Sequence, residues 1–342
     1  MPEKVRTVLV GCGEISRAWL SSEAVRNDVE TAGLVDIDLS AAERLAAEHG
    51  LRQAVIGTDL DTVLRRVRPE AVFDCTVPEA HYRVTLTALA HGCHVLGEKP
   101  MAATMGEARR MVAAARKAGR IYAVIQNRRY QPFVRRLASF LKSDRIGAVT
   151  TLQSNFFIGA HFGGFRDRME HVLLLDMAIH TFDVARLLTE ADAAAVYCLE
   201  WNPSGSWYEH GASAVAVFEM TGGIVYTYQG SWCAEGVNTP WEASWRIQGE
   251  RGGVIWDGAE AFCAEAVSGT TGFIRERRRL DVPPDAPEAK TGGHDGVIGE
   301  FIRCIKTGGV PETVCTDNIK SLAMVHAAIE SAGRRRRVAV KA

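Results

Sequence analysis

The first 126 residues alternate short runs of β-branched and apolar residues with stretches of helical periodicity. The predicted strands are residues 5–10, 30–36, 54–56, 71–77, 94–98 and 121–126. Predicted helices lie between them, at residues 14–25, 40–48, 60–67, 79–90 and 106–117. This alternation is typical of a parallel sheet with helices on both faces. Residues 1–126 are therefore predicted to form an α/β domain with a doubly wound Rossmann sheet.

The pattern changes after residue 126. Helical stretches are expected at residues 130–143 and 172–188, and strand signals then dominate, separated by Gly, Asn and Pro turns. The predicted strands of this part are residues 149–157, 193–201, 212–220, 223–232, 241–248, 253–256 and 262–267, and two helices follow at 296–306 and 318–331. Residues 127–342 are thus expected to form an α+β domain with a large, mostly antiparallel sheet that binds substrate and mediates oligomerisation.

Composition excludes several classes of partner. The 342 residues carry 40 basic and 41 acidic side chains, for a net charge of −1, which gives no sign of a nucleic-acid partner. No run reaches the 18 apolar residues of a membrane span, and the first residues lead into a strand without the apolar core of a signal peptide. The eight cysteines are scattered, with no C-x-x-C pair. These features predict a cytoplasmic protein without a disulfide framework or a zinc ribbon.

A glycine-rich turn joins the first predicted strand to the first helix. Its residues are Gly11-Cys12-Gly13-Glu14-Ile15-Ser16, which match G-x-G-x-x-G except that Ser16 replaces the third glycine. Glycines at the first two positions allow a tight turn and a close approach of the backbone to a pyrophosphate. Gly11, Gly13, Glu14 and Ile15 are therefore predicted to bind a dinucleotide. An ordinary strand-to-helix turn is the alternative.

Asp36 stands at the end of the second predicted strand, 20 residues beyond Ser16. A carboxylate at this place in a Rossmann domain accepts hydrogen bonds from the ribose 2′-hydroxyl, and it would repel a 2′-phosphate. Asp36 thus favours NAD over NADP, and Asp38 is a weaker candidate for the same role.

A lysine follows another strand of the same domain. Glu98-Lys99-Pro100 comes directly after the apolar run His94-Val95-Leu96-Gly97. In open α/β sheets, ligands bind outside the carboxyl ends of the strands, so Lys99 is placed to face a bound molecule.

The motifs together resemble the Gfo/Idh/MocA family of NAD(P)-dependent oxidoreductases, which includes glucose-fructose oxidoreductase and inositol dehydrogenases. Besides the glycine turn and Glu98-Lys99-Pro100, the resemblance rests on three segments: Cys75-Thr76-Val77-Pro78-Glu79-Ala80-His81, Asn127-Arg128-Arg129-Tyr130, and Asp176-Met177-Ala178-Ile179-His180-Thr181-Phe182-Asp183. It spans nearly the whole chain, although its motifs lie in the first 183 residues. One departure is Ala178, where the family more often has glycine.

The resemblance implies a role for each matching residue. Thr76, Pro78 and His81 would line the dinucleotide, Glu98 would bind a nicotinamide-side ribose hydroxyl, and Lys99 would face the reacting carbon. Asp176 and His180 would complete the active site from the second domain. The family also implies assembly into a homodimer or homotetramer.

Oxidation of a secondary alcohol requires a base for the hydroxyl proton while hydride leaves to the nicotinamide. An imidazole titrates near neutral pH, so His180 suits this role. Asp176, four residues earlier on a helix, would share its face and could orient the ring or bind a neighbouring hydroxyl. Lys99 would stabilise alkoxide charge and could itself relay the proton. The alternatives are a structural core histidine at position 180 and a metal site formed with Asp183. No further cysteine or histidine lies at ligand spacing, so no metal is predicted.

The predicted function is hydride transfer between NAD(H) and a sugar, inositol or related polyol. Candidate contacts to substrate hydroxyls are Arg128, and His161 and Arg166 in the polar loop before the catalytic helix. Two alternatives are an NAD-dependent glycosidase that works through transient oxidation and a non-catalytic, NAD-binding regulator.

Overall fold

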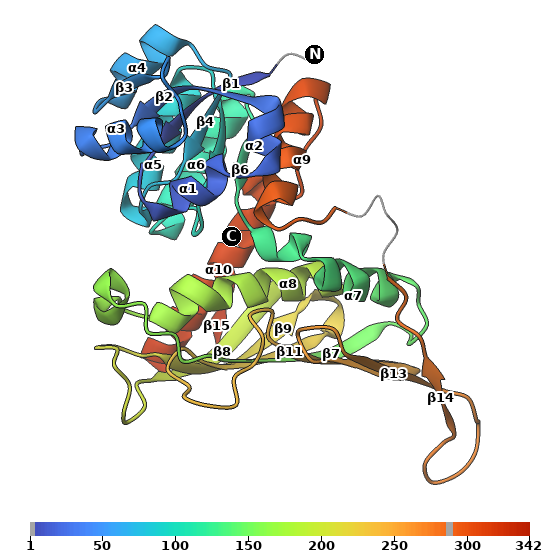
Figure 1. Cartoon of the computed structure of the whole chain (residues 1–342). Coiled ribbons are helices and arrows are strands. Elements are labelled where there is room, and N and C mark those ends of the chain that lie inside the picture. The colour runs from blue at the N-terminus through green and yellow to red at the C-terminus, as the bar shows by residue number, and fades with distance from the viewer. Residues whose placement is uncertain (1–3, 285–289) are drawn as a thin grey trace. The chain divides into compact units, whose positions relative to one another are not determined.

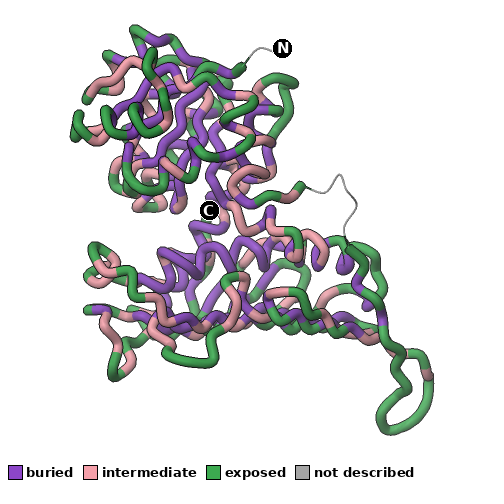
Figure 2. The backbone as a smooth tube through the Cα atoms, in the orientation of Figure 1, coloured by how far each residue is buried: buried purple, intermediate pink, exposed green. Residues whose placement is uncertain are grey.

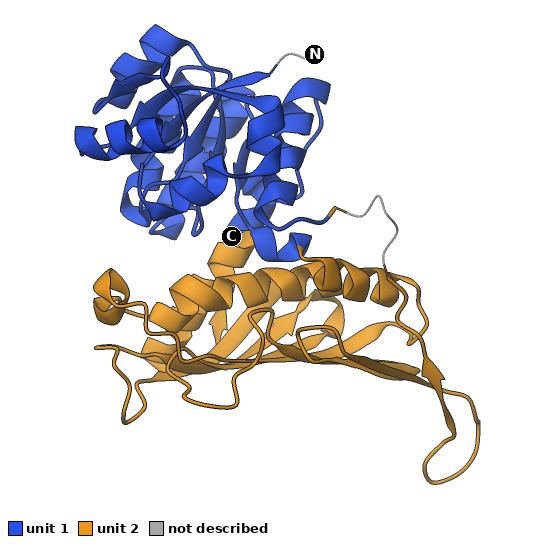
Figure 3. Ribbon diagram, in the orientation of Figure 1, with its two compact units in different colours: residues 1–130, 291–319 blue, residues 131–290, 320–342 orange. Residues whose placement is uncertain are grey.

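The computed structural model describes residues 4–284 and 290–342 (Figure 1). The described residues divide into two compact units (Figure 3). The first comprises residues 4–130 and 291–319, and the second comprises residues 131–284, 290 and 320–342. The sequence boundary predicted at residue 126 lies near Tyr130, but the segment 291–319 belongs to the first unit rather than the second.

The first unit contains the predicted Rossmann sheet. Six strands pair in the order β3-β2-β1-β4-β5-β6, and every pairing is parallel. The strands are β1 (Val5–Val10), β2 (Val29–Val35), β3 (Val55–Gly57), β4 (Ala71–Asp74), β5 (His94–Gly97) and β6 (Tyr122–Val124). The helices between them are α1 (Glu14–Leu20), α2 (Glu23–Asp28), α3 (Leu39–Glu48), α4 (Leu60–Val67), α5 (Pro78–Ala90) and α6 (Met105–Ala118), followed by the 3₁₀ turn η1 (Asn127–Tyr130).

Burial explains why a late segment joins this unit. Helix α9 (His294–Thr307) contributes Val297, Ile298, Phe301 and Ile302 to the same core as Trp19 and Phe73. These side chains are at most 2% exposed. The ring of Phe73 contacts both Trp19 and Phe301. The helix therefore completes one face of the Rossmann core.

The second unit is built on a sheet of nine described strands in the order β14-β13-β12-β11-β7-β10-β9-β8-β15. All pairings are antiparallel except that of β7 with β10, which confirms a mostly antiparallel sheet. The strands are β7 (Val149–Phe157), β8 (Ala193–Trp201), β9 (Ser213–Met220), β10 (Val225–Ser231), β11 (Ser244–Gly249), β12 (Gly252–Trp256), β13 (Phe262–Val267), β14 (Arg277–Leu280) and β15 (Val338–Ala339). The sequence pattern did not predict the two edge strands, β14 and β15.

Helices α7 (Pro132–Lys142) and α8 (Ile179–Thr189) lie along one face of this sheet (Figure 1). Their buried positions and those of the sheet form the interior of the unit (Figure 2). On the sheet, alternate side chains such as Tyr197, Leu199 and Trp201 are exposed, because successive residues of a strand point to opposite faces. The last helix, α10 (Cys315–Arg334), belongs to the first unit up to Ile319 and to the second unit from Lys320.

Among the described residues, no helix is both long enough and apolar enough to cross a lipid bilayer.

Candidate active site

The turn after β1 requires glycine at its first position. Gly11 has φ +88°, and its backbone N–H donates to the carbonyl of Val35 at 2.8 Å. A Cβ atom at Gly11 would lie 2.7 Å from the backbone carbonyl carbon and oxygen of Cys75, which is closer than side-chain carbons approach backbone. At Gly13 a Cβ would meet no atom within 4 Å, so the backbone there is open to a ligand.

Ser16 compensates for the missing third glycine of the motif. Its side chain is fully buried, and its hydroxyl donates to the carbonyl of Gly13 at 2.5 Å. The small hydroxymethyl group thus fits inside the turn, and its hydrogen bond to Gly13 joins the two ends of the turn.

The carboxylate of Asp36 lies against the same turn. Oδ2 accepts from the backbone N–H of Cys12 at 2.6 Å, and Oδ1 accepts from that of Asp38 at 2.9 Å. Burial, with the negative charge of Asp36 adding to it, raises the pKa of the Cys12 thiol to about 12, so this thiol stays neutral. Asp38 instead caps helix α3 by accepting from the N–H of Ser40 at 3.0 Å. Asp36, not Asp38, is therefore oriented toward the glycine turn.

Glu98 is held by two protein donors. Its side chain is 8% exposed, Oε1 accepts from the indole N–H of Trp19 at 2.9 Å, and Oε2 accepts from the backbone N–H of Lys99 at 3.1 Å. Each carboxylate oxygen can accept a further hydrogen bond, so a ribose hydroxyl is still compatible with this arrangement. The indole of Trp19 links the first helix of the glycine turn to the end of β5.

Thr76 and His81 support the loop after β4. The backbone N–H and the hydroxyl of Thr76 both donate to Oδ1 of Asp74, at 3.1 and 2.5 Å. Pro78 is the first residue of α5, where its ring fits the helix and its missing N–H costs no hydrogen bond. His81 is 1% exposed, and both of its ring nitrogens lie against backbone carbonyl oxygens.

His294 lies near Asn127 and interacts electrostatically with Glu98 and Lys99, although no motif in the sequence indicated it. The side-chain amide of Asn127 donates to Nδ1 of His294 at 3.1 Å, which leaves the proton of the neutral ring on Nε2. Burial lowers the pKa of His294, and the positive charges of Arg128 and Lys99 add to this effect, while Glu98 and Asp295 oppose it. His294 and Arg128 thus share the electrostatic environment of Lys99 within the first unit. A histidine at the start of a helix, after two glycines, was the available sequence signal.

Protonation of His294 should make the protein less stable in acid. Because its pKa is lowered on folding, the unfolded chain binds this proton more readily, and stability is lost as the pH falls below the ordinary value near 6.5. Replacing His294 by asparagine, which keeps an acceptor for Asn127, should reduce the loss of unfolding free energy between pH 7.5 and pH 5. Urea unfolding at the two pH values measures this difference, and an unchanged pH dependence in the variant would contradict it.

In the second unit, Asp176 and Arg166 form an ion pair. Arg166 Nε donates to Oδ2 of Asp176 at 2.9 Å, and the guanidinium lies over the rings of Phe162 and Phe165, at 5.0 and 4.8 Å from their centroids. Asp176 is only 9% exposed, and a buried carboxylate needs a nearby positive charge. Arg166 supplies that charge, and its guanidinium lies over the two aromatic rings. Two residues predicted for different roles, one catalytic and one for substrate, are in direct contact.

The segment that carries Asp176 is a π-helix rather than the α-helix predicted for residues 172–188. The π-helix comprises Leu173–Ala178, and α8 begins at Ile179 with His180 as its second residue. His180 is 7% exposed. Such π turns are rare and frequent at functional sites, because the extra residue per turn redirects a side chain. Ala178, where the family more often has glycine, is fully buried in a right-handed helical conformation that alanine adopts without strain.

The other predicted substrate residue of this unit, His161, pairs elsewhere. Its Nε2 lies 2.8 Å from Oε1 of Glu235, and its ring stacks on Trp207 at 3.6 Å between centroids. The neighbouring Tyr208 is 3% exposed and donates to the carbonyl of Ala160. Burial, with smaller effects of Asp176 and Asp167, raises the pKa of Tyr208 to about 12. Tyr208 is thus a neutral hydroxyl whose pKa is affected by the charge of Asp176, and the sequence did not single it out.

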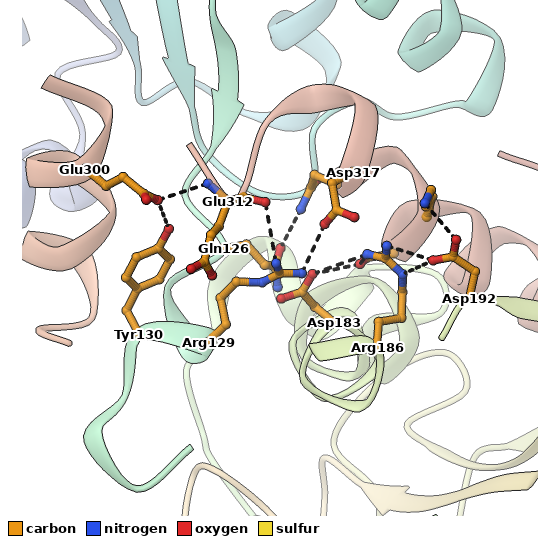
Figure 4. A network of polar contacts seen from close by, with 12 residues as sticks. Gln126, Arg129, Tyr130, Asp183, Arg186, Asp192, Glu300, Glu312 and Asp317 are labelled. Atoms are coloured by element: carbon orange, nitrogen blue, oxygen red, sulfur yellow. Dashed lines mark hydrogen bonds and ion pairs between the residues drawn. The ribbon is translucent and has the colours of Figure 1, made fainter. Parts of the chain in front are cut away.

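Asp183 has a structural role. It is fully buried, and Oδ1 accepts from the hydroxyl of Ser321 at 2.8 Å and lies 3.9 Å from Nη1 of Arg186. Arg186 in turn binds Asp192 (Figure 4). The buried carboxylate of Asp183 therefore belongs to an ionic network that extends to the partly exposed Asp192. The described residues contain no group of three or more His, Cys, Asp or Glu side chains arranged to hold a metal ion.

Comparison with known proteins identifies both parts of the chain. Residues 5–126 match the oxidoreductase family model with an NAD-binding Rossmann fold (GFO_IDH_MocA), and residues 134–255 match the GFO/IDH/MocA C-terminal domain. A D-glucoside 3-dehydrogenase of Escherichia coli is 32% identical over 53% of this chain and 53% of its own length. A 1,5-anhydro-D-fructose reductase of Ensifer adhaerens is 24% identical over 95% of each chain.

Solved structures show the same fold. An oxidoreductase from Agrobacterium radiobacter, crystallised with NAD⁺, L-tartaric acid and magnesium, superposes with a TM-score of 0.83 at 21% identity and covers 98% of each chain. With both family models matched in the expected order, the chain belongs to the Gfo/Idh/MocA family of oxidoreductases.

Proposed function

We propose that the protein transfers a hydride between NAD(H) and a secondary alcohol or ketone of a sugar, inositol or related polyol. The observation that carries this proposal is the set of residues after three parallel strands: Gly11 after β1, Asp36 after β2, and Glu98-Lys99 after β5. These positions share the carboxyl edge of one sheet, where open α/β folds bind their ligands. The related glucoside dehydrogenase and anhydrofructose reductase support the substrate class.

The residues of the first unit fit a dinucleotide. The open backbone at Gly13 would admit the pyrophosphate, Asp36 would accept from the adenosine ribose, and Glu98 from the second ribose. Glu14, Ile15, Thr76 and Pro78 lie beside these groups in the chain and complete the proposed contacts. When bound, the nicotinamide supplies the hydride acceptor or donor.

The chain's own residues would manage the proton and the charge. We propose that His180 takes the hydroxyl proton and that Asp176, fixed by Arg166, orients the substrate or the ring of His180. The ammonium of Lys99 would stabilise the developing alkoxide. Arg128, His161 and Arg166 remain the proposed contacts to substrate hydroxyls.

A substrate panel tests the proposal. Free sugars, alkyl glucosides, inositols and their keto forms would be incubated with NAD or NADH, and the change in nicotinamide absorbance recorded. Net reduction of NAD by at least one polyol is the expected result. Cleavage of an aryl glycoside without net NADH would instead indicate the glycosidase mechanism, and NAD binding without any turnover would indicate a regulator.

The cofactor preference is expected to depend on Asp36. Replacing Asp36 by alanine removes an ionic acceptor for the ribose, so the Kd for NAD should rise by roughly 10- to 100-fold, while that for NADP should rise less or fall. Isothermal titration with both cofactors measures the ratio. The matched control is Asp38→Asn, which keeps the cap on α3 and should leave the ratio unchanged. A wild-type protein that prefers NADP would contradict the assignment of Asp36.

We also propose that the protein forms a homodimer or homotetramer through the exposed apolar side chains of its large sheet, such as Leu199 and Trp201. Light scattering that gives the mass of a single chain would contradict this.

A further inference from the structure

A buried chain of polar contacts lies beneath the loops that follow β4 and β5. Its first member, Asp74, is the last residue of β4 and is completely buried. Oδ1 accepts both bonds from Thr76, whereas Oδ2 is buried without a hydrogen-bond partner in the part of the chain that the structure describes. A buried carboxylate oxygen without a hydrogen-bond donor lowers the stability of the fold unless a positive charge lies nearby.

His81 supplies the next contacts. Nε2 lies 3.0 Å from the carbonyl oxygen of Thr76, and Nδ1 lies 2.9 Å from that of Pro100. Carbonyl oxygens only accept hydrogen bonds, so each contact is satisfied only if the nitrogen carries a proton. A neutral imidazole has one N–H and an imidazolium has two. The geometry therefore calls for the doubly protonated, positively charged ring.

A buried imidazolium requires a counter-charge, and Asp74 is a buried carboxyl group whose pKa is affected by His81. Burial raises the pKa of Asp74, while the charge of His81 and the hydrogen bonds from Thr76 act in the opposite direction. The other titratable groups that interact with Asp74 are the neutral hydroxyl of Tyr122, which donates to the carbonyl of Met101, and the buried thiol of Cys75. Glu98 acts on Cys75 from the end of β5. A positive charge on His81 would therefore favour the ionised form of Asp74 against the effect of burial.

The two carbonyls that His81 binds belong to the two segments proposed to hold the cofactor. Thr76 precedes Pro78 in the first segment, and Pro100 follows Glu98 and Lys99 in the second. We propose that His81 is a positioning residue, doubly protonated and paired with Asp74, which ties these two segments together and so fixes the backbone that carries Lys99. This inference rests on the proposed function for the role of Lys99. It differs from the resemblance, which places His81 in contact with the dinucleotide.

Nitrogen NMR of the imidazole rings tests the charge state without cofactor or substrate. The protein would be labelled with ¹³C and ¹⁵N, and the ring signals of His81 would be assigned among the ten histidines by correlation with the backbone resonances of that residue. At neutral pH the wild-type ring is expected to show two protonated nitrogens. In Asp74→Asn, which removes the counter-charge, one nitrogen should lose its proton. A wild-type ring with one unprotonated nitrogen at neutral pH overturns the proposal, even if neither variant folds.

Cofactor binding tests the positioning role. In His81→Asn the Kd for NAD, measured by tryptophan fluorescence, should rise by roughly 10- to 100-fold, because at least one carbonyl loses its donor. His91→Asn is the matched control, since His91 lies at the other end of α5 on the surface, 2.7 Å from Asp61, and it should bind NAD like the wild type. His81→Gln, which can still donate to one carbonyl, should recover part of the affinity. A folded His81→Asn protein with wild-type affinity would overturn the positioning role.

The two tests separate this inference from the proposed function. If no polyol is oxidised, the proposed function fails, but the NMR and binding results still decide whether His81 is charged and holds the NAD site. If turnover is found and the ring is neutral, only the inference on His81 fails.

Discussion

Replacing Lys99 by methionine is expected to lower kcat by about 100- to 1,000-fold, the range typical for the loss of one group that stabilises oxyanion charge. Methionine keeps the length and packing of the side chain and removes only the ammonium. The backbone contacts of the segment do not depend on that group, because the N–H of residue 99 bonds to Glu98 and the carbonyl of Pro100 lies against His81. The Kd for NAD should therefore change by less than about threefold.

Steady-state kinetics with the best substrate of the panel, combined with NAD titration, measure both quantities. Lys142→Met is the matched control, since it removes an exposed lysine of the second unit that pairs with Glu190, and its kcat should equal that of the wild type. A Lys99→Met variant that loses NAD affinity in proportion to kcat would show that the lysine binds cofactor rather than stabilising the reaction.

The Rossmann part of the fold was predictable because its signals are local. Each parallel strand is a short apolar run bounded by turn residues, and Gly11 and Asp36 are recognised by their distance from strand ends. The return of residues 291–319 to the first unit was not predictable in this way. It depends on Phe301 and its neighbours packing against Phe73, more than 200 residues earlier, and helical periodicity shows that a face is apolar without showing which core it joins.

For the candidate site, the sequence motifs proposed residues, whereas their surroundings became known only from the structure. Motifs predicted Lys99, Asp176 and His180 as candidates, but the π-helix at Leu173–Ala178 has no hydrophobic period that distinguishes it from the α-helix that follows. The motif likewise contained His81 without indicating that both ring nitrogens bind backbone carbonyls. His294 was missed because its relation to Asn127 and Lys99 exists only after α9 packs on the first unit.

Replacing His180 by glutamine is expected to lower kcat by about 100- to 10,000-fold, the usual contribution of a general base. Glutamine keeps a polar side chain of similar reach but does not accept a proton near neutral pH. His180 is 7% exposed, and glutamine is similar enough in size to fill this buried position. The Kd for NAD should therefore stay near that of the wild type. His210→Gln, at an exposed position in the same unit, is the matched control.

The pH profile separates the roles of His180 and Lys99. If His180 is the base, kcat/KM for oxidation should rise with pH across the range from about 5 to 8 in which an imidazole ordinarily loses its proton. That rise should persist in Lys99→Met at a lower rate, because the ammonium only stabilises charge. It should disappear in His180→Gln. A rise that survives in His180→Gln and vanishes in Lys99→Met would assign proton transfer to the lysine and leave His180 as a buried structural residue beside the Asp176–Arg166 pair.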